Sequence, residues 1–120
     1  MRHAGVGFRS GATPASVRDA LRRAGGGGLT RIAIPAVKAA DPLAAELAAS
    51  GLALTLVAPE ALARTATPTQ SPLSLRTHGT GSVAEACALI AAGPGAHLRA
   101  PRTVSQDRMA TAAVAEGVDP

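Results

Sequence analysis

The opening stretch, residues 4–14, limits the possible fold more than any other part of this chain. Residues 4–8 form an apolar run typical of a buried strand, a turn containing Gly11 follows, and Thr13-Pro14 is typical of the N-cap and first residue of a helix. A strand that turns directly into a helix indicates an α/β fold. Because helix N-termini attract anions and Arg9 adds a guanidinium, we expect a negatively charged ligand at this junction.

The glycines of this stretch do not match a nucleotide-binding fingerprint. They stand at positions 5, 7 and 11, and Ser10 occupies the place where G-x-G-x-x-G requires its last glycine. The chain also lacks the phosphate-binding pattern G-x-x-x-x-G-K-[ST]. Glycines selected only for a tight strand-to-helix turn explain the spacing at least as well as a binding loop does.

The chain then alternates between helical and strand patterns. Apolar residues recur at helical spacing from Val17 to Ala24, and Asp41-Pro42 begins a second helix. Further on, the pattern predicts strands at 29–35, 52–58 and 96–100, a helical turn at 59–64 and a helix at 83–92. Strand, helix and strand in this order favour parallel pairing, and the nearly continuous apolar run at 52–58 favours a sheet covered on both faces.

A second glycine-rich helix start follows His78. Residues 79–81 lead to Ser82 and Glu85, whose spacing is typical of a capping box in which each side chain binds the other residue's backbone N–H. This helix start is a second potential anion site. The polar residues 65–72 before it indicate a surface loop and the best candidate for a lid.

Composition and charge exclude several classes of protein. The chain has 12 basic and 8 acidic side chains, but Phe8 is its only aromatic residue, so it lacks the stacking platforms typical of nucleic-acid binders. The longest apolar run is far below the roughly 20 residues that span a bilayer. Cys87 is the only cysteine, which excludes a disulfide framework. We therefore expect a soluble, cytoplasmic protein that binds neither nucleic acid nor membrane.

Four stretches, in this order, resemble the CobE and CbiG C-terminal family of cobalamin biosynthesis. Together they extend over nearly the whole chain. They are Gly5-Val6-Gly7-Phe8-Arg9-Ser10-Gly11, Lys38-Ala39-Ala40-Asp41-Pro42, Thr80-Gly81-Ser82-Val83-Ala84-Glu85-Ala86 and Ala110-Thr111-Ala112-Ala113-Val114-Ala115.

The resemblance implies a fold and a pathway. The expected fold is α/β: a single three-layer α/β/α domain over residues 1–120 with a mixed, mostly parallel sheet. Residues 109–115 favour helix by local propensity, and the resemblance assigns them to a terminal strand instead. The implied role lies in corrin-ring assembly. In longer CbiG proteins this module follows a domain associated with opening a precorrin lactone, whereas stand-alone CobE proteins have no firmly assigned reaction.

Corrinoid intermediates carry several carboxylate side chains, which suit the two helix starts and the nearby cations. We therefore predict a ligand site at the carboxyl ends of the strands, between the 5–13 and 79–83 loops. The predicted ligand-binding residues are Gly7, Phe8, Arg9, Ser10, Gly11, Thr13, Lys38, Thr80, Gly81, Ser82 and Arg102.

Three functions stay open. The first is an accessory or carrier protein that binds a polycarboxylated corrinoid or precorrin and contacts other corrin-pathway enzymes. The alternative is a hydrolase that opens the precorrin lactone and releases a two-carbon fragment. The third is an anion- or nucleotide-binding module outside this pathway. The first is favoured because no nucleophile, base and orienting acid stand at recognisable spacing. We expect neither a cofactor nor a resident metal ion.

Individual candidates each have a structural alternative. Mid-helix Cys87 is expected to be a core residue, not a nucleophile. His78 could transfer a proton or ligate cobalt, although a surface-loop histidine is the more common case. Arg9 could bind the ligand or form an ion pair with Asp41 or Glu85. The catalytic residues, if there are any, are not identified by the sequence.

Overall fold

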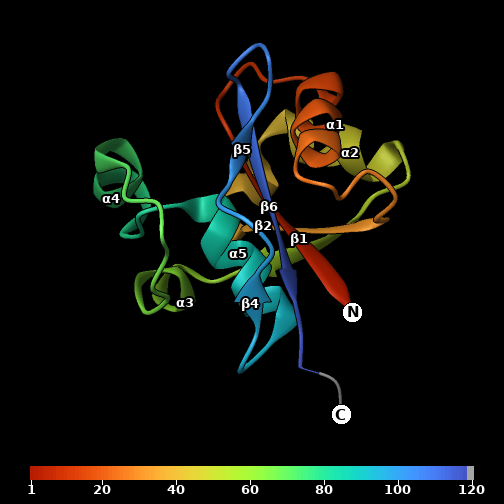
Figure 1. The fold of residues 1–120 in the computed structure, drawn as a ribbon. Helices are drawn as coiled ribbons and strands as arrows, with labels where there is room; N and C mark the ends of the chain where they lie inside the picture. The colour runs from red at the N-terminus through yellow and green to blue at the C-terminus, as the bar shows by residue number, and fades with distance from the viewer. Residues whose placement is uncertain (119–120) are drawn as a thin grey trace.

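The structure, a computed structural model, describes residues 1–118 and contains one open sheet of six strands (Figure 1). The order across the sheet is β3-β2-β1-β6-β4, and β5 pairs with the other end of β6. The strands are β1 (Arg2–Phe8), β2 (Arg31–Pro35), β3 (Ala53–Val57), β4 (His97–Leu98), β5 (Thr103–Val104) and β6 (Ala110–Glu116).

The sheet is parallel on one side and antiparallel on the other. Strands β1, β2 and β3 run parallel, whereas β6 runs antiparallel to β1, β4 and β5. The expected mixed sheet is confirmed, and the expectation that it is mostly parallel holds only for the β1–β3 half. Residues 110–116 form a strand, as the family resemblance implied, because their small side chains fit between both helical layers.

Helices cover both faces of the sheet, which confirms the three layers (Figure 1). Helices α1 and α2 lie on one face, and α5 lies on the other, with α3 and α4 farther out. The bounds are α1 (Pro14–Arg23), α2 (Pro42–Ala49), α3 (Pro59–Ala63), α4 (Pro72–His78) and α5 (Val83–Ala92), and a 3-10 helix, η1 (Ala36–Ala40), connects β2 to α2.

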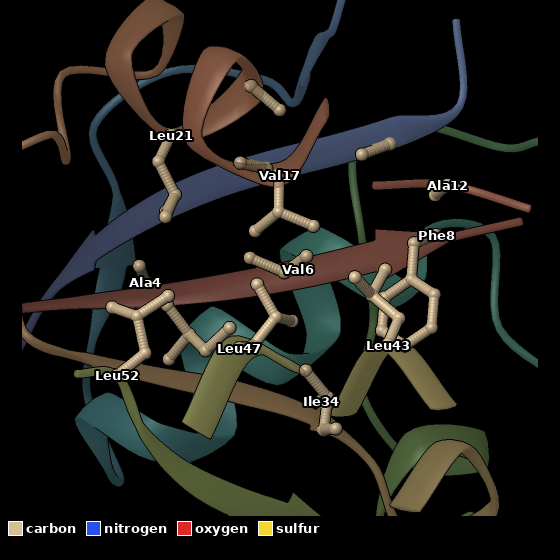
Figure 2. Close-up of a cluster of buried hydrophobic side chains, with 14 of the residues drawn as sticks. Ala4, Val6, Phe8, Ala12, Val17, Leu21, Ile34, Leu43, Leu47 and Leu52 are labelled. Atoms are coloured by element: carbon tan, nitrogen blue, oxygen red, sulfur yellow. The ribbon is translucent and has the colours of Figure 1, made fainter. Parts of the chain in front are cut away.

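The first core lies between the sheet and helices α1 and α2. Alternate residues of β1 point into it, so that Val6 lies near Val17 and Leu47, and the Phe8 ring lies beside Leu43 (Figure 2). All five side chains are buried. Burial of aliphatic side chains of this size contributes about 1.5–3 kcal/mol each.

The opposite face of β1 explains one of the opening glycines. A Cβ atom on Gly5 would lie 2.2 Å from the Ala84 carbonyl oxygen and 2.3 Å from the Ala88 nitrogen. Helix α5 therefore packs its backbone directly against β1, with small residues of β6 such as Ala113 beside it. Position 5 therefore requires glycine, because the backbones of α5 and β1 leave no room for a side chain there.

One expectation about local structure was wrong, and one helix was not predicted. Strand β3 lies at the edge of the sheet, and Leu56 is 51% exposed, so this apolar run is not covered on both faces. Helix α4 was not expected, and its start extends into the polar segment that was interpreted as a loop. Its N-cap Ser71 accepts from Ser74 N at 3.3 Å, and Pro72 is the first helical residue.

Candidate functional site

A cleft of about 430 Å³ lies at the carboxyl ends of β1 and β2, where the sequence placed the site. Phe8 and Pro35, the last residues of these two strands, line it. One wall comes from α4 and the start of α5, and the other from β5, β6 and the hairpin between them. Open α/β sheets generally bind ligands at this edge, because loops rather than strands surround it.

Four cations line this cleft, and no acidic side chain does. They are Arg9, Lys38, Arg102 and Arg108. None of the four forms an ion pair with a carboxylate of the described residues. The Lys38 ammonium lies 5.3 Å from the centre of the Phe8 ring, a cation–π distance. Unpaired cations around a concave surface produce a positive potential that attracts anions.

His78 adds a titratable group to the same cleft. It is partly buried at the end of α4. Burial, followed by the positive charge of Lys38, lowers the pKa of His78 below its ordinary value. The imidazole is therefore uncharged at neutral pH, and it becomes protonated more readily when an anion lies nearby.

Helix α4 forms an apolar and hydroxyl-bearing wall. Leu73 lines the cleft and is 53% exposed, and none of the residues of α4 is buried. Ser74 lines the cleft, but its hydroxyl oxygen is buried and has no hydrogen-bond partner in the part of the chain that the structure describes. A ligand that lies against α4 can bury an apolar face on Leu73.

A buried carboxylate holds both walls in place. Glu85, which is fully buried, accepts from Thr69 N at 2.9 Å, from Thr69 Oγ1 at 2.6 Å and from Arg102 N at 2.8 Å. Thr69 precedes α4, and Arg102 lines the opposite wall. Glu85 therefore connects the segment that leads into α4 with the segment that contains Arg102.

These contacts correct the expected capping box. Glu85 N donates to Ser82 Oγ at 3.3 Å, so Ser82 caps α5 as predicted. The Glu85 carboxylate does not return to the Ser82 backbone, because three other donors surround it. The reciprocal box occurs instead at α1, where Thr13 and Ser16 bind each other's backbone N–H groups at 3.1 and 3.2 Å.

The structure brings five of the predicted ligand-binding residues to the cleft: Gly7, Phe8, Arg9, Lys38 and Arg102. The other six are not among the residues that line the cleft. These six are Ser10, Gly11, Thr13, Thr80, Gly81 and Ser82.

The start of α1 is already occupied by a carboxylate of the chain itself. Ser16 Oγ donates to Asp107 Oδ2 at 2.5 Å, and the Thr13 N–H is bound by Ser16. The start of α5 lies closer to the cleft, since Val83 lines it. Gly81 is needed for packing, because a Cβ there would lie 2.4 Å from the Thr69 carbonyl oxygen.

Several cleft residues were missed by sequence reasoning. Ser71-Pro72 has the same cap-and-proline pattern as Asp41-Pro42 and could have revealed α4 and with it Leu73. Arg108 has no comparable signal, since its position depends on how the β5–β6 hairpin folds.

Other candidate groups lie outside the cleft or are unreactive. Burial raises the pKa of the Cys87 thiol to about 12, so this residue packs as a small apolar group, as expected. Arg9 pairs with neither Asp41 nor Glu85 among the described residues. Within residues 1–118 no cluster of three or more acidic, histidine or cysteine side chains could hold a metal ion.

No helix within residues 1–118 combines the length and apolar character needed to cross a membrane.

The fold and the cleft define a class: an α/β/α domain with one open sheet and a basic cleft at the carboxyl edge of its parallel strands. The chain belongs to the cobalamin synthesis G C-terminus family, whose model matches residues 2–115. It is thus a protein of cobalamin biosynthesis, which confirms the family resemblance seen in the sequence.

Two solved structures are similar over nearly the whole chain. One is CobE, a protein from the cobalamin (vitamin B12) biosynthetic pathway, with 29% identity, a TM-score of 0.81, and coverage of 98% of this chain and 91% of CobE. The other is the cobalamin biosynthesis protein chiG from Agrobacterium tumefaciens str. C58, with 38% identity, a TM-score of 0.73, and coverage of 99% and 100%. No curated protein matches the chain.

Proposed function

We propose that this protein binds a polycarboxylated corrinoid or precorrin intermediate in the cleft and serves as an accessory or carrier protein. The observation that carries the proposal is the charge of the cleft, which four cations line without an acidic neighbour. Membership of the cobalamin family supports a ligand from corrin-ring assembly. Contacts with other enzymes of that pathway belong to the same proposal.

The cleft matches the chemistry of such a ligand. A corrin has apolar faces and a rim of acetate and propionate side chains. Leu73 offers apolar surface, while Arg9, Lys38 and Arg102 offer donors for carboxylates. Pockets of a few hundred cubic ångströms suit drug-sized ligands. A corrin is larger, so we expect one edge of the macrocycle to enter the cleft.

A carrier is favoured over a lactone hydrolase by the groups that the cleft offers. The three hydrogen bonds of Glu85 occupy its carboxylate, and the Cys87 thiol is buried with a raised pKa. His78 is the group in the cleft that can exchange a proton near neutral pH. An imidazole without a neighbouring acid or activated nucleophile suits binding better than acyl hydrolysis.

A titration with cobyrinic acid, a corrin with free carboxylates, tests the proposal. Its fully methylated ester is the matched ligand, because the ester has the same macrocycle without the charges. We expect the acid to bind and the ester to bind at least tenfold more weakly, and we expect salt to weaken binding of the acid. Equal affinity for both ligands, or no binding of the acid, contradicts the proposal.

Variants locate the interaction. Arg9→Gln and Lys38→Gln are each expected to weaken binding of the acid about fivefold, the scale of a partly exposed ion pair of about 1 kcal/mol. Arg31→Gln is the control, because Arg31 is exposed at the start of β2, on the opposite edge of the sheet.

Incubation with a lactone-bearing precorrin separates the two functions: a spectral shift alone indicates a carrier, and a released two-carbon fragment indicates the hydrolase.

A further inference from the structure

The hairpin between β5 and β6 is fixed by an unusual number of polar contacts. The Asp107 carboxylate accepts from Ser105 Oγ at 2.5 Å, from Met109 N at 3.1 Å and from Ser16 Oγ of α1 at 2.5 Å. The hydrogen bonds from Ser105 and Ser16 lower the pKa of the Asp107 carboxyl, so it stays ionised well below neutral pH. This carboxylate thus joins the hairpin to the start of α1.

A second carboxylate holds the same hairpin from the side of α1. Gln106 N donates to Asp19 Oδ2 at 2.8 Å, and Asp19 is itself paired with Arg22 and Arg23. Arg108 N closes the turn by donating to Ser105 O at 2.9 Å. The tip of the hairpin is therefore a rigid support, not a free loop.

Arg108 has a conformation at this tip that its residue type disfavours. Its φ is +62°, and it is the one non-glycine residue with positive φ among those that the structure describes. Glycine or asparagine is the usual choice for this left-handed position after a turn, because a longer side chain crowds the backbone. A residue that occupies a position against its backbone preference indicates a role for its side chain.

The backbone next to Arg108 is hydrogen-bonded to a second arginine that has no ion pair among residues 1–118. Arg9 N donates to Met109 O at 2.9 Å, so the backbones of Arg9 and residues 108–109 are joined directly at the end of β1. Both arginines line the cleft, and neither pairs with a carboxylate of residues 1–118. Two like charges that line one cleft without a counter-charge repel each other, and an anion from outside the chain reduces that repulsion.

We infer that Arg9 and Arg108 form a two-arginine subsite that binds one carboxylate arm of the ligand. Asp107 and Asp19 act as positioning residues, since they fix the hairpin that presents Arg108. The inference rests on the proposed function and deepens it, because it assigns specificity for a carboxylate to one end of the cleft. A guanidinium binds a carboxylate through two parallel N–H donors, which Lys38 cannot do.

Arg108→Gly tests this inference, because it removes the guanidinium and the backbone strain together. We expect the melting temperature to rise by a few degrees while affinity for cobyrinic acid falls about tenfold. Arg108→Lys retains the charge without the planar donors, and we expect it to lose about threefold. A residue with a merely structural role would lose stability on replacement, so a lower melting temperature for Arg108→Gly overturns the inference.

A double-mutant cycle tests whether the two arginines share one carboxylate. If they do, Arg9→Gln combined with Arg108→Gly weakens binding by clearly less than the product of the single effects. Independent effects, or unchanged affinity in Arg108→Gly while the wild-type chain binds the acid, overturn the subsite and leave the proposed function standing. A wild-type chain that does not bind the acid overturns both.

Discussion

The protonation of His78 depends on the other charges in the cleft. Its pKa is lowered by burial and by Lys38, so the folded chain binds a proton at this site less readily than the unfolded chain does. The contribution of this group to stability is therefore present above about pH 6.5 and decreases as pH falls below that value. A bound carboxylate raises the pKa of His78, because it favours the charged imidazolium.

The predicted consequence is proton uptake on binding. Because ligand carboxylates raise the pKa of His78, affinity for cobyrinic acid should increase by about two- to fivefold between pH 7.5 and pH 6. His78→Gln retains a polar side chain without the titration, and we expect its affinity to be nearly constant over this range. Titrations at several pH values measure this. An equal pH dependence in His78→Gln would show that another group takes up the proton.

At the scale of single residues, the sequence predicted three of the four cations that line the cleft, but it did not predict most of the residues around them. Arg9 and Lys38 were predicted and lie in the cleft, because each follows a strand whose pattern is clear. Arg102 was also predicted and lies there, just before the short strand β5, which was not predicted. Arg108 was missed, since its placement depends on hydrogen bonds between the hairpin and α1, which lies far away in the sequence. The spacing of Gly5 was explained by a tight turn or a binding loop, and only the packed α5 backbone shows why position 5 must be glycine.

At the scale of elements, the position of α4 depends on Glu85. This helix buries none of its residues, so few apolar contacts hold it against the rest of the molecule (Figure 1). The segment before it is connected to α5 through Thr69 and Glu85. The polar stretch that was interpreted as a lid thus ends in an anchored helix.

Glu85→Gln tests this connection. The amide nitrogen of glutamine faces N–H and O–H donors and cannot accept from them, so we expect the free energy of unfolding to fall by about 2–4 kcal/mol. Hydrogen exchange should accelerate most in residues 67–78, and affinity for the acid should fall with it. Glu46→Gln is the control, because Glu46 is exposed on α2. Uniform exchange rates across the chain would contradict an anchoring role.

Element prediction succeeded where capping and periodicity agreed. Thr13-Pro14 and Asp41-Pro42 begin helices as expected, and these starts are local hydrogen-bond patterns. The sequence could not show that β3 is an edge strand, because edge and centre depend on which strands pair. The strand at 110–116 needed the family resemblance, since alanine alone favours a helix.

At the scale of the whole molecule, the fold brings distant parts of the chain to one edge of the sheet. Residues from β1, η1, α4 and the β5–β6 hairpin meet in the cleft, although they are separated by up to a hundred positions. The order of strands and helices along the chain predicted which edge of the sheet holds the cleft, because the carboxyl ends of parallel strands meet at that edge. The composition of the walls depends on tertiary packing, which explains why six of the eleven predicted binding residues do not line the cleft.

The most direct test of the account is a map of backbone amide chemical shifts during titration with cobyrinic acid, using the methyl ester as the reference ligand. We expect the acid to shift residues 7–9, 73–78 and 102–111 and to leave the start of β2 and the exposed face of α2 unchanged. Shifts that centre on another surface, or that the ester reproduces in full, would contradict a charged cleft as the binding site.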